Sequence, residues 1–197
     1  MTNEAVASLS NTHLIPYIQV ATVLIGKSRE GGGNMFRHQL DTMSILLDYG
    51  YTDSVLLKAS IIHDVLEDVP DFNHNNILSI DYESHAVYDL VQQVSRRREE
   101  TKAEFLTRIK ESGSFNAKVL KAADRISNMI SLGFVNNFEF INRYIEETEK
   151  HIFPIAEEVN RYMLLELEDL VKSKRKFLLE LKDLRFNTKS VDPIDFI

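Results

Sequence analysis

The sequence predicts an all-α, single-domain protein. Its 197 residues suit one domain, and only 7 glycines and 4 prolines interrupt the chain, which favours long helices. No segment shows the sustained alternation of apolar and polar residues that is typical of a half-buried strand. We therefore expect a helical bundle with a long helical segment at its C-terminus.

Composition and charge narrow the classes of function. The chain has no cysteine, so a metal ion would have to bind histidine, aspartate or glutamate side chains. Its formal net charge of −7 disfavours general nucleic-acid binding, which depends on clustered positive charge. No apolar run is long enough to span a membrane, and the first residues lack the pattern of a signal peptide. We expect a cytoplasmic protein with no membrane partner.

Helical periodicity and turn residues divide the chain into successive helices. Residues 27–34, with three consecutive glycines, are the clearest loop. Asp53 is expected to cap a helix that runs unbroken to Asp68, and Pro154 to start or kink the last helical region. The expected helices cover residues 13–25, 36–49, 53–68, 82–98, 101–112, 115–134 and most of 136–181. We assign residues 1–185 to one domain and residues 186–197 to a C-terminal tail.

The second half of the helix expected at residues 53–68 carries an acidic stripe. His63, Asp64, Glu67 and Asp68 lie at positions i, i+1, i+4 and i+5 of a helix that is otherwise mostly apolar. Burying carboxylates costs several kcal/mol unless they are paired or coordinated. A divalent cation would resolve this conflict, because imidazole and carboxylate are ordinary ligands of zinc, manganese and iron. The alternative is a solvent-facing, acidic helix end.

The helix expected at residues 115–134 carries a second polar stripe. Lys121, Asp124, Arg125 and Asn128 are spaced at i, i+3, i+4 and i+7, and apolar residues cover the rest of the helix. We expect this stripe to face a cavity, with Asp124 as a metal ligand and the two cations near phosphate. The alternative is an exposed helix on which Asp124 forms a salt bridge.

His38, near the start of the helix expected at residues 36–49, could reach a metal ion from outside the acidic stripe. With His38, His63-Asp64 and Asp124 in this order, the chain resembles the HD-domain superfamily, whose pattern of a His, an adjacent His-Asp and a distant Asp binds one divalent metal ion. The resemblance implies a helical bundle of the HD type. It also implies that His38, His63, Asp64 and Asp124 are the metal ligands.

A closer resemblance is to the hydrolase domain of RelA/SpoT enzymes and to small alarmone hydrolases. Residues 63–68, HDVLED, are similar to the family's H-D-x-x-E-D, and residues 121–129, KAADRISNM, to its K-x-A-D-R-x-x-N-[LM] helix. Arg29 precedes His38 across the glycine-rich loop, as an arginine does in the family. The resemblance implies manganese-dependent removal of pyrophosphate from the 3′ position of (p)ppGpp, which gives GDP or GTP.

The resemblance also implies roles for individual residues. Glu67 and Asp68 would position or activate the attacking water and assist proton transfer. Arg29 would stack on or contact the guanine base, and Asn128 and Ser131 would line the nucleoside site. The implied partner is therefore a small guanosine nucleotide.

The chain departs from the family's pattern around the glycine-rich loop. Gln39 replaces the proline that usually follows the first histidine, and Asn34 replaces the loop proline. Glu30 stands where a cation usually follows the arginine. All three lie where the base and the phosphates would enter, so the motifs support the metal site more strongly than the substrate.

The sequence leaves three candidate functions open. The first is the alarmone hydrolase, and the second is an HD phosphohydrolase of another nucleotide: a nucleotide monophosphate, a dNTP or NADPH. The third is a non-enzymatic helical module that keeps a metal or nucleotide site for regulation. The pair Glu67-Asp68 favours the first function over the second, and the complete ligand set argues against the third. The oligomeric state does not follow from the sequence.

Overall fold

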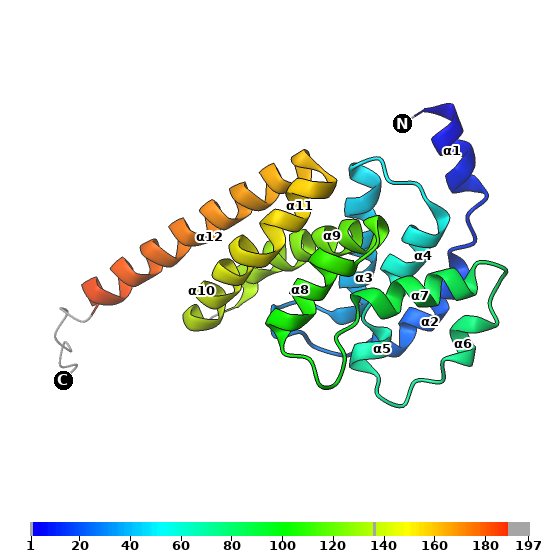
Figure 1. Cartoon of the computed structure of the whole chain (residues 1–197). Coiled ribbons are helices and arrows are strands. Elements are labelled where there is room, and N and C mark those ends of the chain that lie inside the picture. The colour runs from blue at the N-terminus through cyan, green and yellow to red at the C-terminus, as the bar shows by residue number, and fades with distance from the viewer. Residues whose placement is uncertain (1, 136, 189–197) are drawn as a thin grey trace, which may run out of the picture.

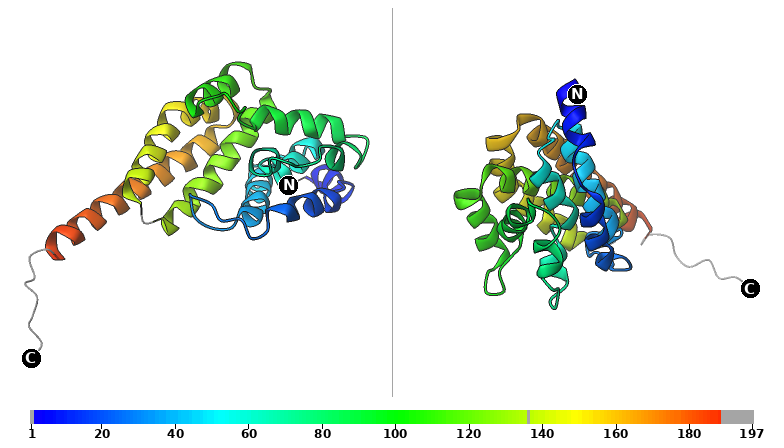
Figure 2. Two further views of the ribbon diagram at one scale, coloured as in Figure 1. Left: turned by 90° about the horizontal axis from the view of Figure 1, so that it is seen from below. Right: turned by 90° about the vertical axis from the view of Figure 1, so that its right-hand side faces the viewer.

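Helices make up nearly all of the secondary structure, as Figures 1 and 2 show from three directions. The computed structural model describes residues 2–135 and 137–188. Within these residues no β-sheet forms, and an isolated bridge between Ser28 and Asn34 closes the glycine-rich loop. The prediction of an all-α fold is confirmed. None of the described helices is both long and apolar enough to cross a membrane.

The helices follow one another with short connections. The first half of the chain forms α1 (Asn3–Ser10), α2 (Ile15–Ala21), α3 (Met35–Asp48), α4 (Ser54–Ile62), α5 (Val65–Asp68) and α6 (Asn75–Leu78). The second half forms α7 (Ser84–Val94), α8 (Lys102–Ser112), α9 (Phe115–Ser131), α10 (Phe138–Glu147), α11 (Phe153–Val159) and α12 (Arg161–Thr188). A π-helical turn, Thr148–Ile152, joins α10 to α11.

Two helices organise the core. α9 packs against α3, α7, α11 and α12, and lies in the middle of the ribbon in Figure 1. α4 packs against α2, α3 and α7, and every residue from 56 to 62 of this helix is buried. Even Lys58 is buried there, because its Nζ lies 2.8 Å from Asp81 Oδ2 and 2.5 Å from Glu83 Oε2. Both central helices therefore carry polar groups into the interior.

Capping residues explain most helix starts. Asn34 accepts hydrogen bonds from the backbone N–H groups of α3, so the residue that replaces the loop proline is an N-cap. Asp53 caps α4 as predicted, and Thr101 forms a capping box with Glu104 at α8. Pro154 lies in the first turn of α11, also as predicted.

The prediction of one unbroken helix over residues 53–68 is wrong. α4 ends at Ile62, and α5 begins at Val65. In a continuous helix the Asp64 N–H would donate to the Ser60 carbonyl. Instead His63 Nδ1 lies 2.7 Å from the Ser60 carbonyl oxygen, and the Asp64 N–H donates to Gln39 Oε1 at 3.4 Å. Two side chains thus replace one helical hydrogen bond.

Other differences from the expected elements are smaller. α1 was not expected, and the helix expected at residues 82–98 is the shorter Ser84–Val94. α12 continues to Thr188, so residues 186–188 of the expected tail are helical, and residues 189–197 lie outside the described part of the chain. The second half of α12 extends past the other helices in both Figure 1 and Figure 2.

Candidate active site

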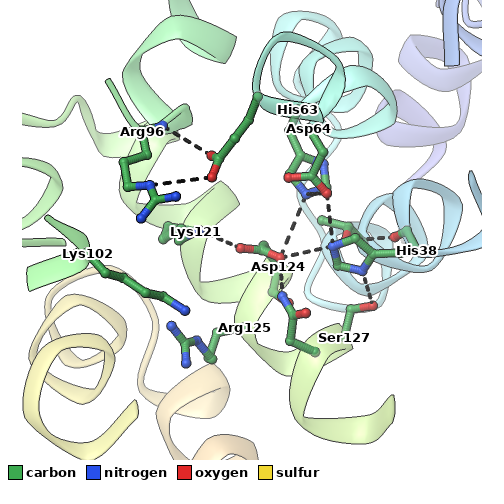
Figure 3. A network of polar contacts seen from close by, with 12 residues as sticks. His38, His63, Asp64, Arg96, Lys102, Lys121, Asp124, Arg125 and Ser127 are labelled. Carbon is green, nitrogen blue, oxygen red and sulfur yellow. Dashed lines mark hydrogen bonds and ion pairs between the residues drawn. The ribbon is translucent and has the colours of Figure 1, made fainter. Parts of the chain in front are cut away.

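Three buried side chains from three parts of the chain meet beside α9. His38 comes from α3, His63 from the turn between α4 and α5, and Asp124 from α9. His38 Nε2 lies 3.0 Å and His63 Nε2 lies 3.7 Å from the same oxygen, Asp124 Oδ1. The candidate ligand atoms of these residues all lie within 4.8 Å of one another. Figure 3 shows Asp124 facing both imidazoles.

Hydrogen bonds at Nδ1 orient both histidine rings and leave Nε2 of each ring facing the cluster, where a metal ion could bind. His63 Nδ1 lies 2.7 Å from the Ser60 carbonyl oxygen, which can only accept, so Nδ1 carries the proton and Nε2 a lone pair. His63 Nε2 is buried and has no hydrogen-bond partner among the described residues. His38 Nδ1 lies 2.8 Å from the Ser127 hydroxyl oxygen, which fixes the orientation of that ring. An unpartnered, buried imidazole nitrogen beside a carboxylate suits a divalent cation.

The electrostatics of the cluster also favour a cation. Burial would raise the pKa of Asp124, but Lys121 and the two imidazoles hold it well below its usual value. Burial lowers the pKa of His63, yet the Asp64 and Asp124 carboxylates outweigh this effect and raise it to about 8. Burial lowers the pKa of His38, despite the same carboxylates. The negative potential of the carboxylates, which favours a proton on His63, also favours a metal cation at this point.

Asp64 borders the cluster from the cleft side. Its Oδ2 lies 3.3 Å from His63 Nε2 and 3.5 Å from His38 Nε2, and its side chain is 23% exposed. The side-chain amide of Gln39 donates to the same oxygen at 2.8 Å. Gln39 therefore orients Asp64, a contact that the proline expected at this position could not make.

A cleft of about 410 Å³ opens over the cluster. His38, Asp64 and Asp124 lie on its floor, and Glu67 and Asp68 also line it. Its volume falls in the range of small-molecule sites, roughly 300–1,000 Å³. Burial, together with the Asp64 and Glu67 carboxylates, raises the pKa of Asp68 to about 6. The sequence-predicted catalytic pair thus faces the same cleft as the candidate metal ligands.

Cations line the same cleft. Lys121 Nζ lies 2.7 Å from Asp124 Oδ2, on the opposite side of that carboxylate from the imidazoles (Figure 3). Arg125 is almost fully buried, its guanidinium 2.5 Å from Glu147 Oε1 and 4.0 Å above the centre of the Tyr144 ring. Both residues therefore line the cleft as the polar stripe on α9 predicts, while each is already paired with a carboxylate.

Arg29 and Asn128 line the cleft and form a connected group with Ser131, which lines a second pocket. Arg29 Nη2 donates to Asn128 Oδ1, and Arg29 Nη1 lies 3.4 Å from Ser131 Oγ. Asn128 Nδ2 in turn donates to Asp124, so the group is connected to the cluster. A second pocket of about 260 Å³ between α3 and α9 lies beyond, and Arg29 lines both cavities. Glu30 also lines the cleft.

Sequence reasoning missed several cleft residues. Arg96 holds Glu67 through its backbone N–H, 3.2 Å from Oε2, and through Nε, 3.7 Å from Oε1. Lys102 is the first residue of α8, and its Nζ lies 3.3 Å from Glu147 Oε1. Burial lowers the pKa of Lys102. The run of three arginines at residues 96–98 was a usable signal for Arg96. Nothing in the sequence marks Lys102 as part of the site.

Comparison with known proteins bears on the fold. No family model matches the sequence, and no curated protein matches it. The chain is, however, similar to a solved structure of a metazoan ortholog of SpoT that hydrolyses ppGpp and plays a role in starvation responses. The two share 21% sequence identity and superpose with a TM-score of 0.70, over 82% of this chain and 94% of the other. The chain has the HD-domain fold.

The HD-domain fold accounts for the placement of the cluster. α3, the turn after α4, and α9 each contribute one of its three buried side chains, although 86 residues separate the first from the last. The resemblance drawn from the sequence motifs is therefore confirmed at the level of the fold.

Proposed function

We propose that this chain is a metal-dependent hydrolase that removes the 3′-pyrophosphate from the guanosine alarmones (p)ppGpp, giving GDP or GTP and pyrophosphate. The observation that carries the proposal is the buried cluster of His38, His63 and Asp124, of which His38 and Asp124 line a cleft that cations also line. The fold of a protein that hydrolyses ppGpp supports it. We place the activity in the cytoplasm.

One divalent ion, which we propose to be Mn²⁺, would be held by His38, His63, Asp64 and Asp124. When bound, such an ion supplies a Lewis acid to a phosphoryl oxygen and lowers the pKa of water. Nε2 of His63, whose ring the Ser60 carbonyl orients, and the ionised Asp124 are the donors best placed to bind it.

Side chains of the cleft carry out proton transfer and stabilise charge on the phosphates. Glu67 accepts the proton of the attacking water, and Arg96 holds its carboxylate at the cleft. Asp68 assists, since its raised pKa lets it exchange a proton near neutrality. Lys121 and Arg125 offset charge on the phosphates.

The nucleoside would lie toward Arg29. Its guanidinium lines both the cleft and the adjoining pocket, and Asn128 and Ser131 hold it in place. A substrate with its 3′-pyrophosphate over the cluster would then direct its base to Arg29. This arrangement suits a nucleotide that is phosphorylated at the 3′ position.

A chelation experiment tests the function. The purified chain is expected to release pyrophosphate from ppGpp, to lose this activity in chelator, and to regain it with Mn²⁺. Parallel assays with NADPH, dGTP and nucleotide monophosphates compare the alternative substrates. Full activity in exhaustive chelator, with no metal found by elemental analysis, would refute metal dependence, and faster turnover of NADPH or dGTP would refute the alarmone assignment.

Arg29→Ala is expected to raise KM for ppGpp roughly ten- to hundred-fold with a smaller change in kcat, because stacking on a base is typically worth ~1–3 kcal/mol and acts on binding. Steady-state kinetics measure both constants. Arg97→Ala is the matched control, since the Arg97 side chain is 69% exposed and is not among the residues that line the cleft. An unchanged KM in Arg29→Ala would show that the base binds elsewhere.

A further inference from the structure

α12 has a buried apolar face and an exposed face of mixed apolar and charged residues. One face is buried against the body of the molecule and includes Met163, Leu167, Val171 and Leu178. The opposite face carries exposed residues at alternating spacings of three and four, the repeat of a coiled-coil seam. We call this set the outer seam; its members are Tyr162, Leu165, Asp169, Lys172, Lys176 and Leu179.

The outer seam is exposed at its apolar positions. Tyr162 is 73% exposed, Leu165 45% and Leu179 63%. Exposed large apolar side chains in regular helical register indicate a surface that another helix can cover. At the centre of the seam, neither Asp169 nor Lys172 makes an ion pair with any residue in the described part of the chain.

The residues of the outer seam can pair with the same residues of a second α12 that runs in the opposite direction. When a second copy of α12 is laid antiparallel, Tyr162 faces Leu179 and Leu165 faces Lys176 of the other helix. Asp169 then faces Lys172, and by symmetry Lys172 faces Asp169, so the centre holds two opposite-charge pairs. The lysine opposite Leu165 can lay its aliphatic stem on the leucine while its ammonium group stays in water.

A parallel arrangement has no such complementarity. It would place Asp169 against Asp169, Lys172 against Lys172 and Lys176 against Lys176, and like charges at facing positions are repulsive. The charges of the seam therefore select one orientation. They also select the partner, since the pattern matches the same residues of an identical helix.

We propose that two copies of this chain form a dimer through antiparallel α12 helices, around a two-fold axis that passes between residues 170 and 171. The contact is isologous, with the same surface used by both copies. Its apolar ends supply the attraction, and its charged centre sets the register.

The surroundings of Leu179 fit this arrangement. Leu179 lines a groove of about 440 Å³ between α12 and the segment around Phe153. The Tyr162 ring of the second copy would lie against Leu179 at this groove, beside Phe153. Phe153, Val171 and Leu179 supply the apolar part of this groove, and its other lining residues are charged. A tyrosine packed against such apolar side chains is a typical anchor of a protein interface. The groove occurs twice in the dimer, once for each Tyr162.

Sedimentation velocity of the full chain across micromolar concentrations tests the proposal. The wild type is expected to dimerise reversibly. Asp169→Lys and Lys172→Asp should each raise the dimer dissociation constant about tenfold or more, because each puts two like-charge pairs at the centre of the interface. The double variant D169K/K172D should dimerise again, since it restores opposite charges at the same positions.

Recovery of dimerisation in the double variant would show that the single variants act at this interface and not through a general change in charge. Asp89→Lys, an exposed charge reversal on α7, which does not pack against α12, should leave the dissociation constant unchanged. A wild type that stays monomeric over the whole range would overturn the proposal. So would a dimer that tolerates both single reversals, or a double variant that is as monomeric as the single ones.

Discussion

Asp124→Asn is expected to reduce hydrolysis by at least ~10³-fold, because it removes the buried carboxylate that faces both imidazoles, and metal catalysis is worth several kcal/mol of transition-state stabilisation. Asparagine keeps nearly the same shape and can still accept the hydrogen bond from Asn128. It cannot supply the negative charge that Lys121 and the candidate metal share. The loss should appear in kcat and in the metal content of the purified protein.

A binding measurement separates this effect from misfolding. Mn²⁺ should raise the Tm of the wild type, because a ligand that binds only the folded state stabilises it, and should leave the Tm of Asp124→Asn unchanged. Asp89→Asn is the matched control: Asp89 is exposed on α7, and it lines neither the cleft nor the adjoining pocket. If Asp124→Asn kept its metal and most of its activity, the cluster would not be the metal site.

Glu67→Gln is expected to lower kcat by about 10²–10⁴-fold, the range typical of general-base assistance. Glutamine keeps the size of the side chain and can still accept the hydrogen bond from the Arg96 N–H, but it cannot accept a proton. Metal content and substrate binding should stay near those of the wild type, since Glu67 lies outside the cluster of His38, His63 and Asp124. Elemental analysis and steady-state kinetics measure these quantities.

Two outcomes would change the assignment of Glu67. Loss of metal in Glu67→Gln would make Glu67 a ligand, and an unchanged kcat would make its contact with Arg96 purely structural. Asp68→Asn is the companion variant, and we expect a milder loss, because Asp68 assists in proton transfer while Glu67 accepts the proton of the attacking water. Equal losses in both variants would indicate that the two carboxylates act together.

The helices and the metal cluster follow from local features of the sequence. Periodic apolar residues, with the predicted cap Asp53 for α4, place α4 and α8 within a few residues of their observed starts. The two polar stripes are recognisable because buried carboxylates and cations need partners, wherever the helices pack. Together with the resemblance to HD-domain proteins, these stripes predict that His63 and Asp124 bind one metal ion, and the two side chains lie 3.7 Å apart, measured from Nε2 to Oδ1.

The break between α4 and α5, the contacts of Gln39, and the roles of Arg96 and Lys102 depend on tertiary structure. Local propensity favours a continuous helix at residue 63. The His63 side chain takes the Ser60 carbonyl locally, but the acceptor for the Asp64 N–H is the Gln39 side chain, 25 residues away in the sequence. Arg96 reaches Glu67 across 29 residues of intervening chain. Such contacts depend on how separate helices pack, and no local pattern encodes the distance between two helices.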